Sequence, residues 1–322
     1  MQPFRRFAAA LIGAVLIAPA IHAQAWPAKP IRLLVPFPPG GGTDLIAREL
    51  ANKATASGYT FVIDNKPGSG GNIGVDMAAK APADGYTLVM GQTSNLAINP
   101  TLYSKLPYDP VKDLTPVSLV ASSPLVIVTA ADSPIKTLAD VVKQARENPG
   151  LINYATSGNG TVAHLAVESL QKVAGIKLTH VPYKGAAQGA TDVLSGQVQL
   201  YVSSIPTLMG HIRNGKMRPL AVTSLKRAAY LPQVPTIAES GYKGFDAVTW
   251  FGILGPARLP ADIVSRLNAD IHKALKDAEL QKRLGEQGAT VESGTPEQFG
   301  GLIQGDIARW GRIVKESGAK VD

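Results

Sequence analysis

The chain has 322 residues and no cysteine; 45% of its residues are hydrophobic, 17% are charged, and its formal net charge is +8. This composition is ordinary for a folded globular protein and argues against a disordered chain. The lack of cysteine excludes disulfides, thiolate metal sites, cysteine nucleophiles and a lipid-bearing N-terminal cysteine. Because lysine and arginine form no run of five and only 6% of residues are aromatic, we expect no nucleic-acid partner, but a mild positive field that favours anionic small molecules.

Residues 1–25 have the features of a secretory signal peptide. Arg5 and Arg6 precede an apolar run that is shorter than the roughly 20 residues of a spanning helix, and "AQA" offers a cleavage site, with the cut after Ala23 or Ala25. A retained membrane anchor is the alternative, but no second apolar stretch reaches spanning length. We therefore expect an exported, freely soluble protein of the periplasm.

Apolar strand-like runs then alternate with amphipathic helix-like runs. The strand-like runs, in chain order, are IRLLVPF, FVIDN, YTLVMGQ, LVIVTA, INYATS, KLTHVPY, VQLYVS, RPLAVTS and FGILGP. Helix-like stretches such as TLADVVKQAREN lie between them, and the tail from residue 260 onward is mostly helical. The alternation predicts the α/β class, with parallel sheets covered by helices on both faces.

The alternating pattern occurs twice, which predicts two lobes. We expect lobe 1 to comprise residues 26–122 plus 248–322 and lobe 2 to comprise residues 123–247, joined by two crossings of the chain. Two such lobes enclose a cleft, and open α/β sheets bind ligands beyond the carboxyl ends of their strands.

The first candidate site is "PFPPGGGTDLIAREL", residues 36–50, between a strand-like run and a helix-like run. Gly41 and Gly42 leave backbone N–H groups accessible to a ligand, and Thr43 or Asp44 is expected to cap the helix. Ile46, Leu50 and Ala54 are expected to form its buried face. An anion is the natural guest of such a turn, and Phe37 would form an apolar wall beside it.

"INYATSGNGTVAHLAVESL", residues 152–170, repeats this arrangement in the second unit. It places Ser157, Gly160 and Thr161 in the turn and His164 in the helix that follows. If the lobes face each other, two helix N-termini converge on one guest from opposite sides. A small molecule with a carboxylate fits that arrangement.

Nucleotide binding and catalysis find little support. "GNGTVA" satisfies G-x-G-x-x-G/A, but the next strand "KLTHVPY" has no acidic residue for a ribose, and no P-loop motif is present. G-x-S-x-G is absent, and the five histidines form no H-x-x-x-H pair. We therefore expect no cofactor, metal or catalytic residue. His164 is either a packed, hydrogen-bonding histidine or a donor to an acidic ligand.

Two further polar stretches follow strand-like runs. "GQTSNLAINP", residues 91–100, supplies Thr93, Ser94 and Asn95, which can cap the next helix, bind a ligand, or do both. "NKPGSGGNIG", residues 65–74, is interpreted as a structural turn because its glycines closely follow a proline.

Taken in order, several long stretches resemble the substrate-binding proteins of tripartite tricarboxylate transporters, the Bug-type solute receptors. They are WPAKPIRLLVPFPPGGGTDLIAREL, VIDNKPGSGGNIGVDMAAKAPADGYTLVMG, INPTLYSKLPYDPVKDLTPV, NYATSGNGTVAHLAVESL, HVPYKGAAQGATDVLSGQV and IRNGKMRPLAVTS. The resemblance implies a type II periplasmic binding protein, a monomeric Venus flytrap without enzymatic activity, that closes on a carboxylated solute and delivers it to a membrane permease.

The resemblance also implies which residues bind. The family's first binding loop corresponds to residues 36–44, its second to residues 92–95, and its opposing lobe to residues 157–164. Backbone amides and small hydroxyls of these loops hold the carboxylate in the family. The expected ligand-binding residues are Phe37, Gly41, Gly42, Thr43, Asp44, Thr93, Ser94, Asn95, Ser157, Gly160, Thr161, His164 and Ser203.

The sequence departs from many relatives at "VQLYVSSIP". Val202, Ser203 and Ser204 stand where relatives have an acidic or amide residue. No ammonium-binding role is therefore assigned to this loop, and a dicarboxylate or aromatic carboxylate is favoured over an amino acid. A periplasmic sensor that docks onto a sensor kinase is the alternative function, and an exported α/β enzyme is a more distant one.

Overall fold

The computed structural model describes residues 26–55 and 58–321, so the predicted signal peptide lies outside the described residues. The strands are β1 (Ile31–Val35), β2 (Phe61–Asn65), β3 (Thr87–Gln92), β4 (Leu114–Ala130), β5 (Asn153–Thr156), β6 (Thr179–Pro182), β7 (Leu200–Ser204), β8 (Met217–Val222), β9 (Val248–Pro256) and β10 (Thr290–Val291). The helices are α1 (Gly42–Ala54), α2 (Asn72–Ala79), α3 (Asn99–Leu102), α4 (Leu138–Glu147), α5 (Val162–Ala174), α6 (Ala186–Leu194), α7 (Ile205–Arg213), α8 (Ala261–Leu275), α9 (Ala278–Glu286) and α10 (Pro296–Ser317), with short turns η2 (Ser69–Gly71) and η3 (Ser94–Ile98).

The strands form a sheet in the order β2-β1-β3-β9-β4-β7-β5-β6, with β8 and β10 also paired to β4. β1 pairs in parallel with β2 and β3, and β5 pairs in parallel with β6 and β7. β4 and β9 instead run antiparallel to their neighbours in the middle. The α/β class is confirmed, and the predicted parallel pairing is found among β1, β2 and β3 and among β5, β6 and β7, but not in the middle of the sheet. The chain passes through the middle once in each direction, which makes those pairings antiparallel.

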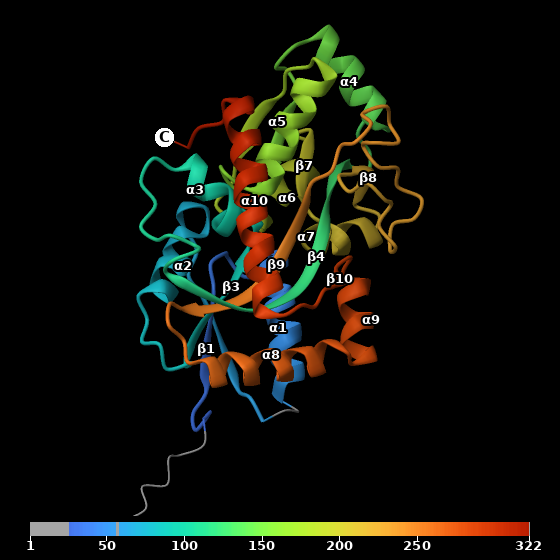
Figure 1. Ribbon diagram of the computed structural model, residues 1–322. Helices are drawn as coiled ribbons and strands as arrows, with labels where there is room; N and C mark the ends of the chain where they lie inside the picture. Colours follow the sequence, from blue (N-terminus) through green and yellow to red (C-terminus); the bar gives the residue numbers. More distant parts are fainter. Residues whose placement is uncertain (1–25, 56–57, 322) are drawn as a thin grey trace, which may run out of the picture.

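β4 belongs to both halves of the sheet. Its residues 114–124 pair with β9, whereas its residues 125–130 pair with β7 and β8. We call β1, β2, β3, β9, β10 and the first part of β4 half-sheet 1, and β5 to β8 with the rest of β4 half-sheet 2. Figure 1 shows β4 and β9 running side by side from the lower to the upper part of the molecule.

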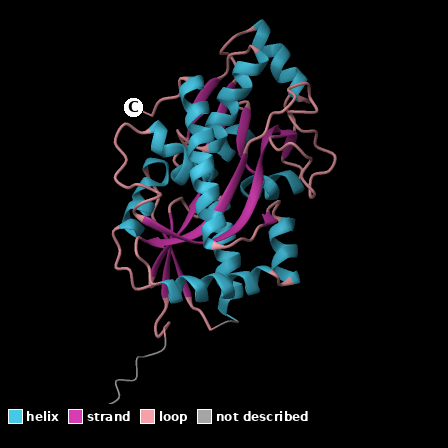
Figure 2. Ribbon diagram, in the orientation of Figure 1, coloured by secondary structure: helices cyan, strands magenta, loops and turns pink. Residues whose placement is uncertain are grey.

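Helices cover both faces of the sheet (Figure 2). On one face of half-sheet 1, α1, α8 and α9 bury an apolar cluster that includes Ile46, Leu50 and Ala54, the predicted inner face of α1. On the other face, α10 packs against β4, α3 and η3 and also reaches α5 beside half-sheet 2. No helix in the described part of the chain combines the length and the apolar character needed to cross a membrane.

Candidate functional site

A cleft lined by residues of both half-sheets lies beyond the carboxyl ends of β1, β3, β5, β6 and β7. It encloses about 560 Å³, including the part open to solvent, and none of its lining side chains is charged. The lining residues are Phe37, Pro38, Gly41, Gly42, Thr43, Gln92, Ser94, Leu125, Ser157, Thr161, Val162, Ala163, Gly185, Ala186, Ser203, Ser204, Thr207, Thr249 and Phe251.

The first turn of α1 forms the wall from half-sheet 1. Gly41 is the N-cap and the helix begins at Gly42, so the prediction that Thr43 or Asp44 caps it is wrong. Gly41 has no side chain that could cap the helix, and among the described residues the N–H group of Thr43 makes no hydrogen bond. Free N–H groups and the helix dipole make this turn a favourable place for an anion.

Asp44 does not line the cleft; it holds the glycine loop from behind. Its Oδ2 accepts hydrogen bonds from Gly40 N and Arg48 Nε, each at 2.9 Å, and its Oδ1 accepts one from Asn65 Nδ2 at 2.9 Å. Burial by itself would raise the pKa of Asp44, but the hydrogen bonds from Arg48, Gly40 and Asn65 outweigh it and lower the pKa. The carboxylate therefore stays ionised and fixes the turn that precedes α1.

Replacing Asp44 by asparagine should destabilise the protein at neutral pH by about 1–3 kcal/mol, because an amide cannot accept all three hydrogen bonds. The folded pKa lies below the unfolded one, so this stability is present above about pH 4 and is lost as the pH falls through the folded pKa. Urea unfolding of Asp44→Asn and the natural chain at pH 7 and pH 3 checks this. A stability difference that stays the same at both pH values would contradict the assignment.

The first turn of α5 forms the wall from half-sheet 2. Thr161 caps the helix: its Oγ1 accepts from His164 N at 3.3 Å and donates to Gly158 O at 3.0 Å. Gly160 has a φ of +75°, and a side chain there would collide with Leu102 of α3. The turn therefore requires glycine at this position.

Direct hydrogen bonds cross the cleft between the two walls. Gly42 N donates to Thr207 Oγ1 at 3.0 Å, and Val162 N donates to Ser94 Oγ at 3.2 Å. The backbone of Gly42 also comes so close to α7 that a Cβ there would lie 2.5 Å from Ser204 Oγ. On each side of the cleft, a backbone N–H group in the first turn of a helix therefore donates to a hydroxyl from the other side.

The predicted ligand-binding residues divide into two groups. Those that line the cleft are Phe37, Gly41, Gly42, Thr43, Ser94, Ser157, Thr161 and Ser203. Asp44, Thr93, Asn95, Gly160 and His164 lie outside the lining. Thr93 Oγ1 accepts from Trp250 N of β9 at 3.0 Å, and Asn95 Oδ1 accepts from Gln92 N at 3.0 Å, so both support the loop after β3.

Sequence reasoning missed the contributions of α6 and α7. Gly185 and Ala186 at the start of α6, and Ser204 and Thr207 at the start of α7, also line the cleft. The signal was present in "YKGAAQ" and "VSSIPT", each a strand end followed by small residues and a helix. Among the described residues, histidine and the acidic residues form no group of three that could hold a metal ion.

Residues 46–319 match the family model described as the tripartite tricarboxylate transporter family receptor. The chain belongs to this family. Over 307 aligned residues it is 39% identical to the protein BugT of Bordetella pertussis. The alignment covers 95% of this chain and 94% of BugT. The resemblance found in the sequence is therefore confirmed, and this family member is a solute-binding receptor rather than an enzyme.

Solved structures agree with this assignment. R. palustris Rpa4515 with adipate matches with a TM-score of 0.89 and 36% identity, covering 92% of this chain and 100% of that one. MatC from Rhodopseudomonas palustris with bound malate matches with a TM-score of 0.84 and 30% identity, covering 90% and 100%. The fold is that of two-lobed periplasmic binding proteins.

Proposed function

We propose that this receptor binds a small organic carboxylate in the periplasm and delivers it to the membrane permease subunits of a tripartite tricarboxylate transporter. The observation that supports it is the convergence of helix N-termini: the first turns of α1, α5, α6 and α7 open onto one cleft whose lining has no charged side chain. Backbone N–H groups and helix dipoles stabilise an anion there. Neutral donors also favour release, because a desolvated ion pair would slow the dissociation that delivery requires.

The binding residues that we propose are the predicted residues that line the cleft. Gly41, Gly42 and Thr43 would hold the ligand from the side of α1, and Ser157 and Thr161 from the side of α5. Ser94 and Ser203 supply hydroxyls, and Phe37 supplies an apolar wall together with Leu125 and Phe251. Asp44, Thr93, Asn95, Gly160 and His164 would act by holding these loops in place.

The proposed lobes are residues 26–122 plus 248–322 and residues 123–247. In support, β4 exchanges β9 for β7 and β8 as partners near Pro124, and β9 begins at Val248. Closure about these two crossings would bring the first turns of α1 and α5 together on the ligand. A ligand that contacts both walls favours the closed population.

A dicarboxylate or an aromatic carboxylate is the proposed substrate class. Opposed anion-binding turns suit a molecule with a carboxylate at each end, while Phe37, Leu125 and Phe251 suit an apolar middle. No acidic side chain lines the cleft to pair with an ammonium group. The relatives Rpa4515 and MatC, solved with adipate and malate, agree with this class.

A thermal-shift screen of the chain from Trp26 onward tests the proposal. Adipate or malate at about a hundred times its dissociation constant should stabilise the protein by roughly 2.7 kcal/mol, whereas aspartate and glutamate should not. A benzene carboxylate distinguishes the aromatic class. Stabilisation by aspartate alone would refute the proposed substrate class, and no shift with any carboxylate, from a folded and ligand-stripped sample, would refute the carboxylate site.

A further inference from the structure

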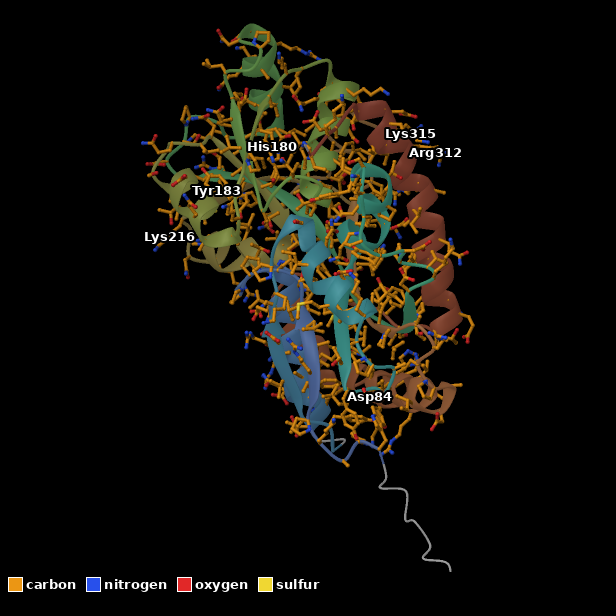
Figure 3. The ribbon with its side chains drawn as sticks, turned by 90° about the vertical axis from the view of Figure 1, so that its left-hand side faces the viewer. Asp84, His180, Tyr183, Lys216, Arg312 and Lys315 are labelled. Carbon is orange, nitrogen blue, oxygen red and sulfur yellow. The ribbon has the colours of Figure 1, made fainter. Side chains whose placement is uncertain are left out.

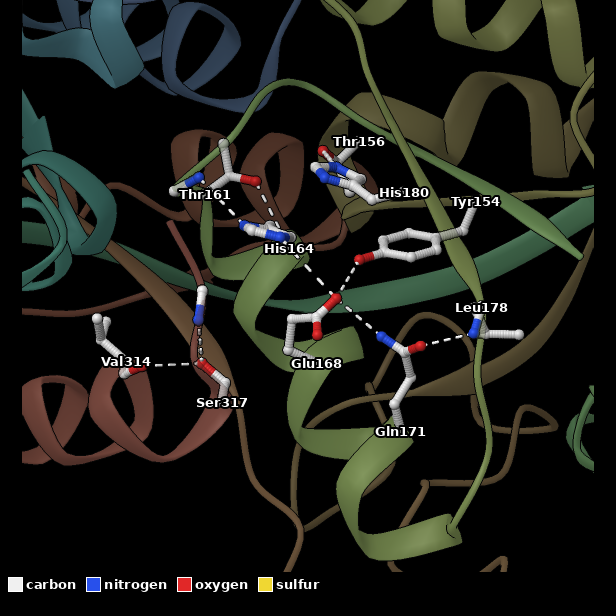
Figure 4. Close-up of polar contacts among 12 residues, drawn as sticks. Tyr154, Thr156, Thr161, His164, Glu168, Gln171, Leu178, His180, Val314 and Ser317 are labelled. Carbon is white, nitrogen blue, oxygen red and sulfur yellow. Dashed lines mark hydrogen bonds and ion pairs between the residues drawn. The ribbon is translucent and has the colours of Figure 1, made fainter. Parts of the chain in front are cut away.

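The loop that forms the α5 wall rests on two stacked histidines. The rings of His164 on α5 and His180 on β6 lie parallel, with centroids 4.3 Å apart, and Tyr154 of β5 stacks on the other face of His180 at 4.8 Å. His164 is 7% exposed, and His180 is half-buried. Figure 3 labels His180 in the upper part of the molecule, and Figure 4 shows both histidines with Tyr154, Thr156 and the polar contacts of His164.

Each histidine supports the glycine loop at a different point. Gly160 N donates to Nδ1 of His164 at 3.3 Å. Nε2 of His180 lies 2.7 Å from Thr156 Oγ1, which itself donates to Gly158 O at 3.0 Å. The loop that places Ser157 and Thr161 in the cleft is thus held at Gly158 and at Gly160.

The contact to Gly160 requires an unprotonated Nδ1 on His164. The imidazole proton then lies on Nε2, which faces Glu168 Oε1 at 3.9 Å. The same carboxylate oxygen accepts from Tyr154 OH and from Gln171 Nε2, each at 2.8 Å. These bonds orient Glu168 beside His164 without using the nitrogen that holds the loop.

The other elements around α5 add no further charged partner close to the ring. β7 (Leu200–Ser204) contributes the titratable Tyr201 and no charged side chain. α3 and η3 place the uncharged Leu102 and Asn99 beside Gly160. α10 contributes Glu316, which pairs with Lys172 at 3.1 Å, two turns along α5 from His164. It also contributes Arg309 and Arg312, which share a pocket with Ala166, Ser169 and Val173 of α5 rather than with His164. His180 and Glu168 are therefore the titratable groups that face His164.

The imidazole of His164 is kept neutral by its surroundings. Burial lowers the pKa of His164, and the nearby Glu168 only partly opposes this. Burial and the neighbouring His164 lower the pKa of His180 to about 3. If the loop moved away and exposed either ring, the pKa of that ring would return to about 6.5. Because the exposed ring binds a proton more readily, acid favours the state in which the loop no longer contacts the rings.

We propose that His164 is a positioning residue for the ligand site: its neutral imidazole holds the turn from Gly158 to Thr161 in the binding geometry, and its protonation releases that turn and weakens ligand binding in acid. This rests on the proposed function for the site itself. A proton on Nδ1 would set one N–H group against that of Gly160, and the turn would lose its acceptor. The turn held by the neutral imidazole is favoured above about pH 6.5. As the pH falls to 5, the equilibrium constant between the held and the released turn decreases by up to about thirtyfold for one histidine.

Hydrogen exchange at the Gly160 amide tests the proposal without any ligand. In the natural chain, the protection factor should fall at least fivefold between pH 7.5 and pH 5. In His164→Asn the fall should be clearly smaller, because an asparagine oxygen can replace Nδ1 as acceptor and does not titrate, which leaves only His180 to respond to acid. In His164→Leu protection should be low at both pH values. Equal pH profiles for the natural chain and His164→Asn would overturn the proposal, even if carboxylates do not bind.

Binding of adipate provides the second readout. The ratio of the dissociation constants of the variant and the natural chain is measured from pH 7.5 to pH 5, so that titration of adipate itself cancels. His164→Asn should bind like the natural chain at pH 7.5 and at least threefold more tightly than it at pH 5. His211→Asn, on α7 away from the cleft lining, should follow the natural chain throughout. A natural chain that gains affinity in acid relative to His164→Asn would show that the added positive charge dominates, and would overturn the proposal.

Discussion

Replacing Gly42 by aspartate is expected to abolish carboxylate binding while leaving a folded protein. A Cβ at this position would lie 2.5 Å from Ser204 Oγ, so the two walls could no longer approach as closely. The added carboxylate would also stand at the N-terminus of α1 and repel an anionic ligand from the N–H groups it needs. Together these effects should weaken adipate or malate binding more than a hundredfold, about 3 kcal/mol, by isothermal calorimetry.

Gly305→Asp is the matched control for this variant. Gly305 lies on the exposed side of α10, with open space where a side chain would be added. The Gly305→Asp variant carries the same added charge at a position outside the cleft lining. Its affinity for adipate or malate should therefore stay within about twofold of that of the natural chain. Acidic residues in the first turn of a helix are favourable, so Gly42→Asp should retain its thermal unfolding transition. Binding of normal strength by folded Gly42→Asp would refute the assignment of the α1 turn as an anion site.

Replacing Phe299 by alanine should lower the free energy of unfolding by about 3–5 kcal/mol, the typical cost of removing a buried aromatic side chain. Phe299 of α10 is 1% exposed, and its ring packs edge-on against Trp250 of β9 with centroids 5.5 Å apart. The ring lies over Gly252, where an added Cβ would be 2.3 Å from Phe299 Cζ. Loss of the ring therefore leaves a cavity between α10 and β9, a strand that connects the halves of the molecule.

Urea unfolding measures this loss, and Phe299→Leu provides a graded comparison. Leucine fills part of the cavity and should cost less than alanine, because the penalty grows with the empty volume that remains. Arg312→Ala serves as a surface control on the same helix (Figure 3) and should change stability by less than about 0.5 kcal/mol. A loss below 1 kcal/mol for Phe299→Ala would mean that α10 does not depend on this contact.

Local features of the site could be predicted because they depend on neighbours in the chain. Strand, glycine turn and helix follow one another around Gly41 and around Gly160, and periodicity over a few residues reveals them. The cap at Thr161 depends on a hydrogen bond to His164 N, three residues away. Such contacts form whenever the segment adopts its local fold.

The less local features were missed or assigned differently. Asp44 was expected to bind the ligand and, with Thr43, was a candidate cap of α1, yet it accepts a hydrogen bond from Asn65, 21 residues along the chain. For His164 the sequence left open a packed, hydrogen-bonding role or a role as donor to the ligand, and its ring stacks on His180 behind the loop. Thr207 received no role, although Gly42, 165 residues earlier, donates to it. None of these partners lies within the window that a local pattern covers.

By itself, the sequence determined the α/β class, the two glycine turns, the family and the choice of small neutral residues at the strand ends. Only the tertiary structure decided the antiparallel course of β4 and β9, the contributions of α6 and α7 to the cleft, and which predicted residues face it. The physical reason is range. Helix periodicity and capping arise within a few residues, whereas sheet order and register depend on burying apolar surface across the whole chain at once. The same global packing places Thr207 against Gly42 and Gly160 against His164.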